Sequence, residues 1–252
     1  MTTRSKYRSG VLTFHDDAAS FETVMPMAPL QFFEEFIGAG HTAGIPAAGS
    51  PTAGYPWVKK IVGAAPPTVA LVNNASGGVA QLALTATGEK QDAALYWNDN
   101  LAIDVTKRAV FETRAALAVA PSAAGVQMVM GLAAAWIDGP DNNVKYLEFG
   151  ATANANLLVR SQDGTTQSSI AASNAAGAIV LDTNFHIFRI SAEDPTDVAF
   201  YVDGARVNAT GSIAYAATGA NAILQPYFAV YKPSGTGVAT LQVDKVDIWA
   251  NR

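Results

Sequence analysis

Apolar residues recur at every second position in two runs near residue 190. Phe188 and Ile190 share one face of the first run, and Val198, Phe200 and Val202 share one face of the second. A period of two is typical of half-buried strands, because successive side chains of a strand point to opposite faces of the sheet. The pattern therefore predicts two strands that pair as a β-hairpin.

The residues around these runs have the chemistry of tight turns. Between the runs, the segment 193–197 contains Pro195, whose ring fixes φ, and acidic side chains that accept hydrogen bonds from nearby backbone N–H groups. After the second run, Asp203 and Gly204 form a dipeptide typical of two-residue hairpin loops. These turn signals support the strand ends that the alternation predicts.

Further strands are predicted at regular intervals along the chain. The run 126–136 is apolar at both odd and even positions, which favours a central strand covered on both faces. In the last run the parity of apolar positions changes between Val243 and Val246, and a β-bulge near Asp244 and Lys245 would reconcile the two halves. Besides the hairpin, the predicted strands lie at 30–36, 69–72, 79–87, 93–97, 109–119, 126–136, 145–151, 156–161, 166–171, 224–231 and 238–249.

These strands predict one all-β domain with little helix, because no segment keeps a helical period over three turns. We expect an extended N-terminal arm at 1–31 and a β-sandwich at 32–252, with a Gly/Ala/Pro-rich loop at 37–67. Within this loop, Trp57 is expected to anchor the loop to the sheet rather than to stack on a sugar. The arm has two interpretations that the residues leave open: a partly disordered terminus, or an arm that crosses to a neighbouring subunit.

Composition narrows the classes of function. Hydrophobic residues make up 50% of the 252 residues and charged residues only 15%, against roughly 25% charged in an average soluble domain. So few charges favour a surface that is partly buried in an assembly. The net charge of −5 argues against nucleic-acid binding, which needs a basic face. No run approaches the roughly 18 apolar residues of a membrane span, and the short run 11–14 predicts no signal peptide.

The residue types that carry catalysis are sparse. Cysteine is absent, and the three histidines, His15, His41 and His186, have no metal-ligand spacing. Glu34 and Glu35 are adjacent on a predicted strand, so their side chains face opposite ways and cannot share a site. Nucleophile-elbow, phosphate-loop and dinucleotide motifs are also missing. We therefore expect a protein that is not an enzyme and has no cofactor.

Two loops hold side chains that could bind a ligand. Asp138, Asp141 and Asn143 carry oxygens of the kind that Ca²⁺ prefers, but the same residues are common in ordinary turns, and we favour the turn. Trp136 before this cluster and Trp97 before Asn-Asp-Asn could stack on a sugar ring. The residues alone leave the alternatives of turn, metal site and glycan site open.

Several segments together resemble a known group of proteins. The chain resembles the concanavalin A-like (laminin-G-type) jelly rolls, and more closely those in structural proteins of tailed bacteriophages. Glycoside hydrolases with this fold share an acidic strand motif, E-x-D-x-x-E, and the nearest segment here, 244–247, lacks its glutamates. The resemblance rests on the order and spacing of SKYRSGVLTFHDD, FFEEF, AALYWNDNLAIDV, FRISAEDPTDVAFYVDGARV and LQPYFAVYKPSGTGVATLQVDKVDIW.

The resemblance implies a two-sheet antiparallel jelly-roll sandwich and a virion protein without enzymatic activity. Within that class we expect a capsid decoration (cement) protein on the outer capsid surface, assembled in the host cytoplasm. Its partners would be the major capsid protein and copies of itself, as a dimer or trimer. The alternative is a glycan-binding module of a tail or head fibre that uses Trp97 and Trp136. The residues expected to contact the capsid or another subunit are Arg4, Lys6, Tyr7, Arg8 and Phe14.

Overall fold

The computed structural model describes residues 30–37, 44–153, 156–174, 177–209 and 211–251 in full. Before residue 30 it describes the backbone of three paired antiparallel strands, β1 (Thr3–Arg8), β2 (Val11–Asp16) and β3 (Phe21–Val24). The segment expected as an extended arm thus includes a three-stranded sheet. The side chains predicted to contact a capsid or subunit lie outside the described residues: Arg4, Lys6, Tyr7, Arg8 and Phe14.

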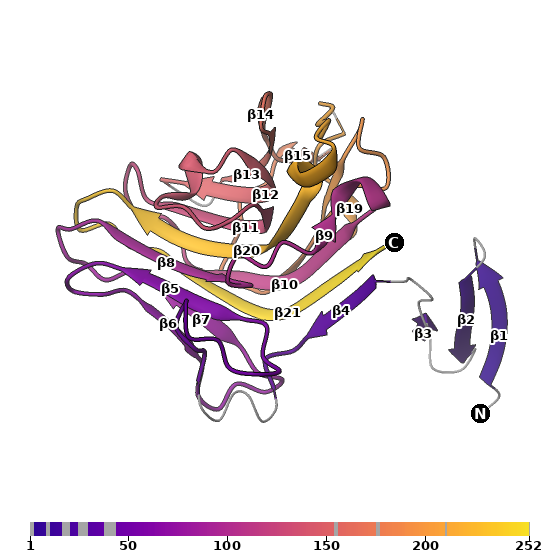
Figure 1. The fold of residues 1–252 in the computed structure, drawn as a ribbon, viewed down its shortest axis with the longest axis horizontal. Helices are drawn as coiled ribbons and strands as arrows, with labels where there is room; N and C mark the ends of the chain where they lie inside the picture. Colours follow the sequence, from indigo (N-terminus) through magenta and orange to yellow (C-terminus); the bar gives the residue numbers. More distant parts are fainter. Residues whose placement is uncertain are drawn as a thin grey trace.

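Two eight-stranded antiparallel sheets pack face to face (Figure 1). Sheet I has the order β19-β18-β17-β10-β21-β7-β6, and β4 also pairs with β21. The strands of sheet I are β4 (Leu30–Glu34), β6 (Thr68–Leu71), β7 (Ala80–Ala83), β10 (Val110–Val119), β17 (His186–Ser191), β18 (Ala199–Val202), β19 (Ala205–Arg206) and β21 (Thr240–Ala250).

Sheet II has the order β14-β13-β12-β11-β20-β8-β5, and the short β9 also pairs with β20. Its strands are β5 (Val58–Val62), β8 (Gln91–Tyr96), β9 (Ile103–Asp104), β11 (Gln127–Ala133), β12 (Lys145–Thr152), β13 (Leu157–Asp163), β14 (Gln167–Ala171) and β20 (Ile223–Lys232). The remaining described elements are the pair β15 (Ser173–Asn174) and β16 (Gly177–Ala178), and the 3-10 turns η2 (Val105–Lys107), η3 (Pro140–Asn142) and η4 (Gly219–Ala222).

The core lies between the two sheets and is held by aromatic contacts across them. Phe149 on sheet II meets Phe188 and Phe200 of sheet I, with ring centroids 5.3 and 5.2 Å apart. Phe228 of sheet II lies 6.0 Å from Phe111 of sheet I. These edge-on and tilted contacts are the preferred geometries of aromatic pairs. The all-β antiparallel sandwich predicted from the sequence is therefore confirmed.

The alternation near residue 190 is confirmed in detail. Strands β17 and β18 pair as a hairpin, with Phe188 opposite Val202 and Ile190 opposite Phe200, and all four side chains are buried in the core. The next turn has φ of 49° at Asp203 and 79° at Gly204, and it leads into β19. A tight two-residue hairpin turn requires positive φ at two successive positions, so the turn predicted at Asp203 and Gly204 is confirmed.

Two further predictions about strands are confirmed. In the β10/β21 pair, Arg114 lies opposite Lys245 and Ala115 opposite Val243, so Asp244 is the extra residue of a bulge. Strand β11 lies between β12 and β20 near the middle of sheet II, and six of its seven residues are buried. Its outer face is covered because a long loop, described below, folds over it.

The predicted loop at 37–67 is wrong in one respect, because it contains strand β5. Five residues between Pro56 and Pro66 extend along β8 and complete the edge of sheet II. The prolines of this region flank β5 and do not lie within it. Proline has no backbone N–H to donate, and an edge strand tolerates such residues at its ends. Trp57, just before β5, is fully buried against Phe32, Phe36 and Phe228, as expected for an anchor.

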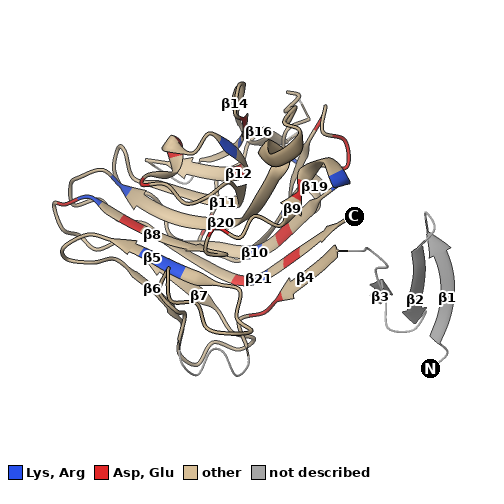
Figure 2. Cartoon of the chain, viewed as in Figure 1, with Lys and Arg blue, Asp and Glu red and all other residues tan. Residues whose placement is uncertain are grey.

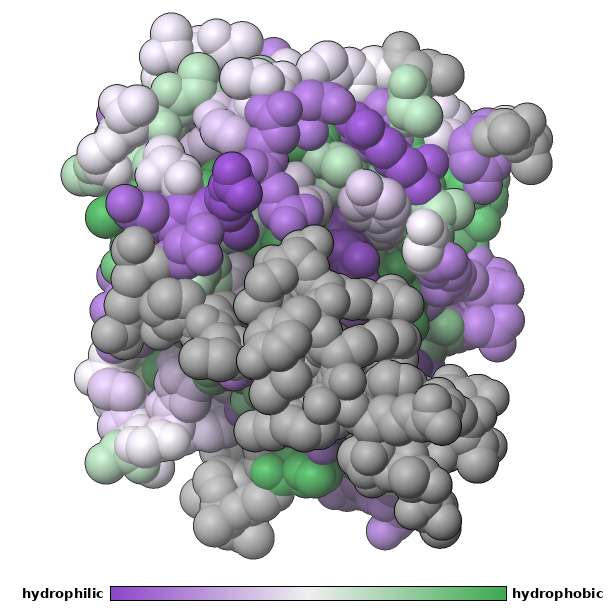
Figure 3. Space-filling view, turned by 90° about the vertical axis from the view of Figure 1, so that its right-hand side faces the viewer, coloured by the Kyte–Doolittle hydropathy of each residue, from purple (hydrophilic) through white to green (hydrophobic). Residues whose placement is uncertain are grey.

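The sandwich begins at Leu30, two residues before the predicted boundary, because β4 pairs with the end of β21. Leu30 lies opposite Ala250, and Glu34 opposite Val246. Charged residues are scattered thinly over both sheets (Figure 2), and the face turned to the viewer in Figure 3 carries hydrophilic residues along its upper part. In the described part of the chain, no helix is long and apolar enough to cross a membrane.

Candidate functional site

The outer face of sheet II, which points away from sheet I, carries an unusual set of polar side chains. Pairing registers align Asp92 of β8, Tyr231 of β20 and Gln127 of β11 in one row across three neighbouring strands. Further along the sheet, the register places Glu148 of β12 beside Arg160 of β13 on the same face. Alternation puts these residues outside, because their chain neighbours pack into the core.

A loop that joins β11 to β12 lies over this face, and we call residues 134–144 the flap. At its start the Trp136 N–H donates to Asp99 Oδ1 at 2.6 Å. Further along, the Gly139 N–H donates to Asp92 Oδ2 at 3.4 Å. Its last turn is held by Gln127, whose Nε2 donates to Asp141 Oδ2 at 2.5 Å. The flap thus spans the sheet from the β8–β9 loop to the row that contains Asp92.

The flap residues considered as Ca²⁺ ligands point to three different partners. Asp138 forms an ion pair with Lys90, and Asp141 Oδ1 accepts from Arg160 Nη1 at 2.7 Å. Asn143 Nδ2 donates to the Ala135 carbonyl at 3.3 Å. Among the residues that the structure describes, no cluster of three or more His, Cys, Asp or Glu has a geometry that could hold a metal ion. The side chains therefore fold the flap rather than converge on a cation.

A buried ion pair lies under the end of the flap. Arg160 Nη2 donates to Glu148 Oε1 at 2.6 Å, and both side chains are almost fully buried. The guanidinium lies over Gly150, where an added Cβ would stand 3.0 Å from Arg160 Nε. Burial raises the pKa of Glu148 to about 7 although Arg160 opposes the shift. Burial also works against the charge of Arg160, but Glu148 and Asp141 together raise its pKa.

Asp92 is a second buried carboxyl on this face, and it has no cation in direct contact. Its side chain is 0% exposed; it accepts a long hydrogen bond from the Gly139 N–H, and the Trp136 side chain also donates toward it. Burial raises the pKa of Asp92 to about 7, and the nearby charge of Asp138 adds to the effect. The neighbouring phenol of Tyr231 also has a raised pKa, first because of burial and then because of Asp138. A buried carboxyl without a close partner is costly to ionise.

Five buried polar atoms of the flap and of the outer face of sheet II have no protein partner with hydrogen-bond geometry, although the Trp136 side chain is close enough to Asp92 to lower its pKa. Two are donors, Trp136 Nε1 and Arg160 Nε, and three are acceptors, Asp92 Oδ1, Gln127 Oε1 and Asp138 Oδ1. All five atoms are buried. Buried polar atoms normally have partners, and buried water commonly supplies them.

Besides the bond from Trp136 to Asp99, the side chain of Gln225 also joins the β8–β9 loop to the flap. Its Oε1 accepts from the N–H groups of Trp97 and Asp99, both at 3.1 Å. Its Nε2 donates to Asp99 Oδ1 at 3.1 Å and to the Ala134 carbonyl at 3.0 Å. The two loops that the sequence suggested separately as glycan contacts are thus brought together at one end of sheet II.

Of the two tryptophans suggested for glycan stacking, the structure places only Trp136 at the surface. Trp136 is half-buried, and the Lys60 ammonium lies 4.8 Å from its ring centroid. Trp97 is 8% exposed and packs into the core against Phe32, with centroids 4.7 Å apart. The prediction for Trp97 is therefore wrong, and strand parity explains why: Trp97 shares the core face with Leu95.

His186 is hydrogen-bonded to two carboxylates far from the flap. Its Nδ1 lies 2.7 Å from Asp203 Oδ2 and its Nε2 lies 3.0 Å from Asp182 Oδ1. Burial lowers the pKa of His186, but the bonds to both carboxylates outweigh that effect and raise it. This arrangement lies at one end of the β17/β18 hairpin in sheet I and does not contribute to the outer face of sheet II.

Sequence reasoning did not single out Asp92, Glu148, Arg160 or Gln225. Each lies inside or beside an otherwise apolar strand, and that interruption is the signal that could have drawn attention to them. A charged residue in such a run is buried only when a partner or a ligand compensates for it. The partners come from strands distant in sequence, so the pattern alone does not identify them.

No protein-family model matches the chain, and no curated protein sequence matches it. Solved structures do resemble it. A GH16 protein of a Bacteroides ovatus mixed-linkage glucan locus, in complex with a G4G4G3G product, has a TM-score of 0.54 at 12% identity, covering 86% of this chain and 99% of that one.

Two further structures are similar over most of their length. The endo-β-1,4-glucuronan lyase of Trichoderma reesei has a TM-score of 0.50 at 13% identity, covering 76% of this chain and 90% of that one. The carbohydrate recognition domain of Emp47p has a TM-score of 0.50 at 9% identity, covering 83% of this chain and 95% of that one. Identities this low show a shared fold and not a shared activity. The chain is thus a jelly-roll β-sandwich of the concanavalin A-like type.

Proposed function

We propose that the protein is a non-catalytic, lectin-like glycan-binding module. Its contact surface consists of the flap, residues 134–144, and the adjoining β8–β9 loop at 97–102. The observation that carries the proposal is the half-buried ring of Trp136, with the exposed polar side chains of Asp99, Asn100 and Asn142 beside it. A sugar hydroxyl both donates and accepts, so a mixed set of donors and acceptors fits it better than it fits an ion.

The rim of this surface supports the same ligand class. Trp136 offers a half-buried ring, and apolar sugar faces stack on such rings. Asp99, Asn100 and Asn142 are exposed beside it and carry amide or carboxylate oxygens. Ordered binding sites combine such an aromatic contact with a few placed polar groups. The Emp47p carbohydrate recognition domain and the GH16 protein with its bound product have the same fold, which is compatible with the proposal.

The same surface argues against catalysis. A pair of catalytic carboxyls must reach the substrate, and one of them must give or take a proton. Here Glu148 is bound to Arg160, and Asp92 lies beneath Gly139 of the flap. Neither carboxyl reaches solvent, because Asp92 is 0% exposed and Glu148 3% exposed. We therefore propose binding without cleavage.

A glycan array followed by calorimetric titration tests the proposal. Replacing Trp136 by alanine should weaken binding of the selected glycan about tenfold, because a stacked aromatic ring contributes on the order of 1–3 kcal/mol. Trp249→Ala is the matched control, since Trp249 is also half-buried but lies on the outer face of sheet I. Equal losses in both variants, or no glycan bound by the unaltered protein, would contradict the proposal.

The capsid decoration function is the second candidate. One observation favours it: the outer face of sheet I exposes large apolar side chains, with Phe33 56% and Ile187 44% exposed. Exposed apolar side chains on one face, in a chain with 15% charged residues, fit burial against a capsid protein or another copy. Imaging the native particle would test this. Density at capsomer junctions would support decoration, whereas density on a fibre tip would favour glycan recognition.

The predicted role of the N-terminal segment has its own test. A variant without residues 1–29 keeps all strands of the two sheets, because β4 begins at Leu30. If the segment binds the particle through Arg4, Lys6 and their neighbours, this variant should fold but fail to bind. Retained binding by the truncated protein would contradict the role of the segment while leaving decoration itself open to other surfaces.

A further inference from the structure

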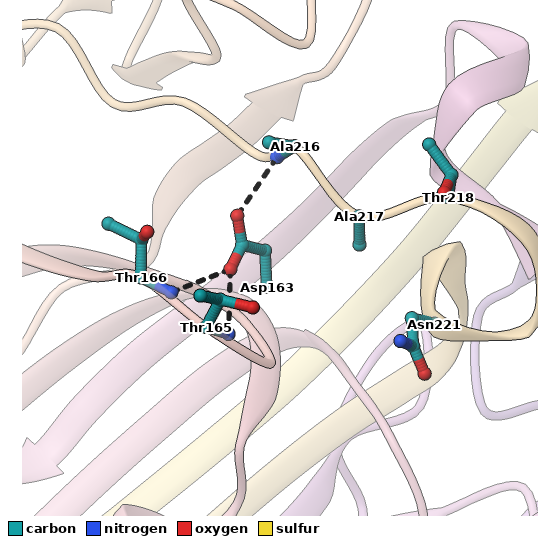
Figure 4. Close-up of a pocket in the computed structure, with 7 residues that line it drawn as sticks. All are labelled: Asp163, Thr165, Thr166, Ala216, Ala217, Thr218 and Asn221. Atoms are coloured by element: carbon teal, nitrogen blue, oxygen red, sulfur yellow. Dashed lines mark hydrogen bonds between the residues drawn. The ribbon is translucent and has the colours of Figure 1, made fainter.

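A pocket near the base of the flap has a rigid anionic wall. Asp163 ends β13, and its Oδ1 accepts from the N–H groups of Thr165 and Thr166 at 2.9 and 2.7 Å. Its Oδ2 accepts from the Ala216 N–H at 3.2 Å, so the carboxylate joins two segments distant in sequence (Figure 4). Burial raises the pKa of Asp163, but these backbone N–H bonds outweigh it and hold the pKa below its usual value. The carboxylate therefore stays charged.

The opposite wall is also held in place. Asn221 Oδ1 accepts from Lys145 Nζ at 2.7 Å, which leaves the Asn221 amide N–H groups without a protein partner among the described residues. The Asn221 carbonyl accepts from Tyr215 Oη at 3.0 Å, and Tyr215 is almost fully buried. Figure 4 shows Thr218 and Asn221 across the pocket from Asp163. A fixed side chain loses little conformational entropy when it binds a ligand.

The size and lining of the pocket define the class of ligand. Its volume is about 340 Å³, at the low end for small-molecule sites. The hydroxyls of Thr165, Thr166 and Thr218 line it, and none has a protein partner in the described part of the chain. The lining has no aromatic ring, and its apolar groups are the methyl groups of alanine and threonine. Such a lining fits one small ligand rich in hydroxyl groups.

Charge narrows the ligand further. The Asp163 carboxylate repels anions, so a sulfate, a phosphate or a uronic acid is disfavoured. Both carboxylate oxygens already accept backbone N–H bonds, which also disfavours a metal ion that needs them as ligands. A neutral hydroxyl can still donate to Asp163 and accept from Asn221. These conditions together describe a neutral sugar residue.

The pocket lies at the end of sheet II where the flap begins and ends. Lys145, which binds Asn221, follows the last flap residue, and its carbonyl accepts from the N–H of Ala134 at the start of the flap, at 2.9 Å. Register pairs Lys145 with Asp163 on the core-side face, whereas the flap covers the outer face, so a glycan reaches both only by passing around this end of the sheet. We propose that this pocket binds a single neutral sugar residue of the same glycan, an inference that rests on the proposed glycan-binding function.

The test compares threonine-to-valine variants in calorimetric titrations with the neutral oligosaccharide selected on an array. Thr165→Val and Thr218→Val remove hydroxyls and keep the side-chain shape, and each should weaken binding about fivefold, with the double variant losing about twentyfold. Thr236→Val is the control, since Thr236 is exposed in the β20–β21 loop, and its affinity should stay within about twofold of the unaltered protein.

The outcomes separate the two proposals. Affinity unchanged in the double variant but reduced in Trp136→Ala would overturn the pocket and leave the flap surface standing. Tighter binding of a uronic-acid oligosaccharide than of its neutral counterpart would overturn the assigned ligand class. Absence of glycan binding by the unaltered protein would overturn both. Circular dichroism of each variant verifies the fold, and losses in both single variants and a larger loss in the double variant, with Thr236→Val unchanged, support the pocket.

Discussion

Replacing Asp92 by asparagine should stabilise the fold at pH 8 and change it little at pH 4. In the folded protein, burial raises the pKa of Asp92 to about 7 from an ordinary value of 3.8. The unfolded chain loses its proton at lower pH than the folded chain does. The folded state therefore binds more protons between these values, and stability falls as pH rises through this window.

The size of the effect follows from the shift. A shift of about three pKa units corresponds to roughly 4 kcal/mol, most of it lost between pH 4 and pH 7. This figure is an upper value because the buried side chain can relax toward solvent. Asparagine has no charge to bury and keeps an oxygen for the Gly139 N–H. The variant should therefore lack this part of the pH dependence.

Urea unfolding of both proteins at pH 4, 6 and 8 measures the effect. The difference in unfolding free energy between Asp92→Asn and the unaltered protein should grow by several kcal/mol from pH 4 to pH 8. Taking the difference cancels the titration of every other group that the two proteins share. A difference that does not vary with pH would refute the claim that Asp92 is buried without a compensating cation.

Three further results are expected. Gly150→Ala should lower the unfolding free energy by about 1–3 kcal/mol in urea titrations, because its Cβ would press on Arg160 Nε; unchanged stability would mean that the guanidinium does not lie there. Bonds to Asp203 and Asp182 raise the pKa of His186, so the unaltered protein should lose thermal stability as pH rises above about 6.5 and the imidazole loses its proton. In His186→Gln this loss should be absent. The same loss in both proteins would exclude His186 as its source. Trp97→Ala should cost about 3–5 kcal/mol of stability, as expected for a buried aromatic side chain, and a surface role for Trp97 would instead leave the melting temperature unchanged.

Local patterns in the sequence were enough to predict the structural features that depend only on neighbouring residues. Alternation located the β17/β18 hairpin, and the change of parity located the bulge at Asp244. Trp57 was correctly expected as an anchor, since a lone tryptophan is normally buried. These features follow from strand geometry over a few residues, and strand geometry is encoded locally.

The candidate site was predicted only in part, because it is assembled from distant segments. Gln225 joins Asp99 to the flap across 126 residues of chain, and no local pattern indicates such a contact. The fold of the flap over sheet II also escaped prediction, since turn residues indicate a loop but not the surface it covers. Asp92 and Arg160 are buried, and their pKa values are shifted, because the flap covers this face of sheet II. The candidate site therefore depends on pairing between strands that are far apart in the sequence.

The pairing of β4 with β21 has a consequence for how the protein folds. Leu30 and Ala250 are opposite each other, although they are separated by almost the whole sandwich in sequence. During synthesis, β4 leaves the ribosome long before its partner strand β21 has been made. Its apolar residues Phe32 and Phe33 therefore stay without that strand until β21 is translated. Sheet I therefore closes after translation of β21, as a late step with high contact order, and such steps are slow and prone to aggregation. Variants in which the translation of residues 240–250 is slower should accumulate a species in which β4 is unpaired, and chaperones should bind this exposed strand.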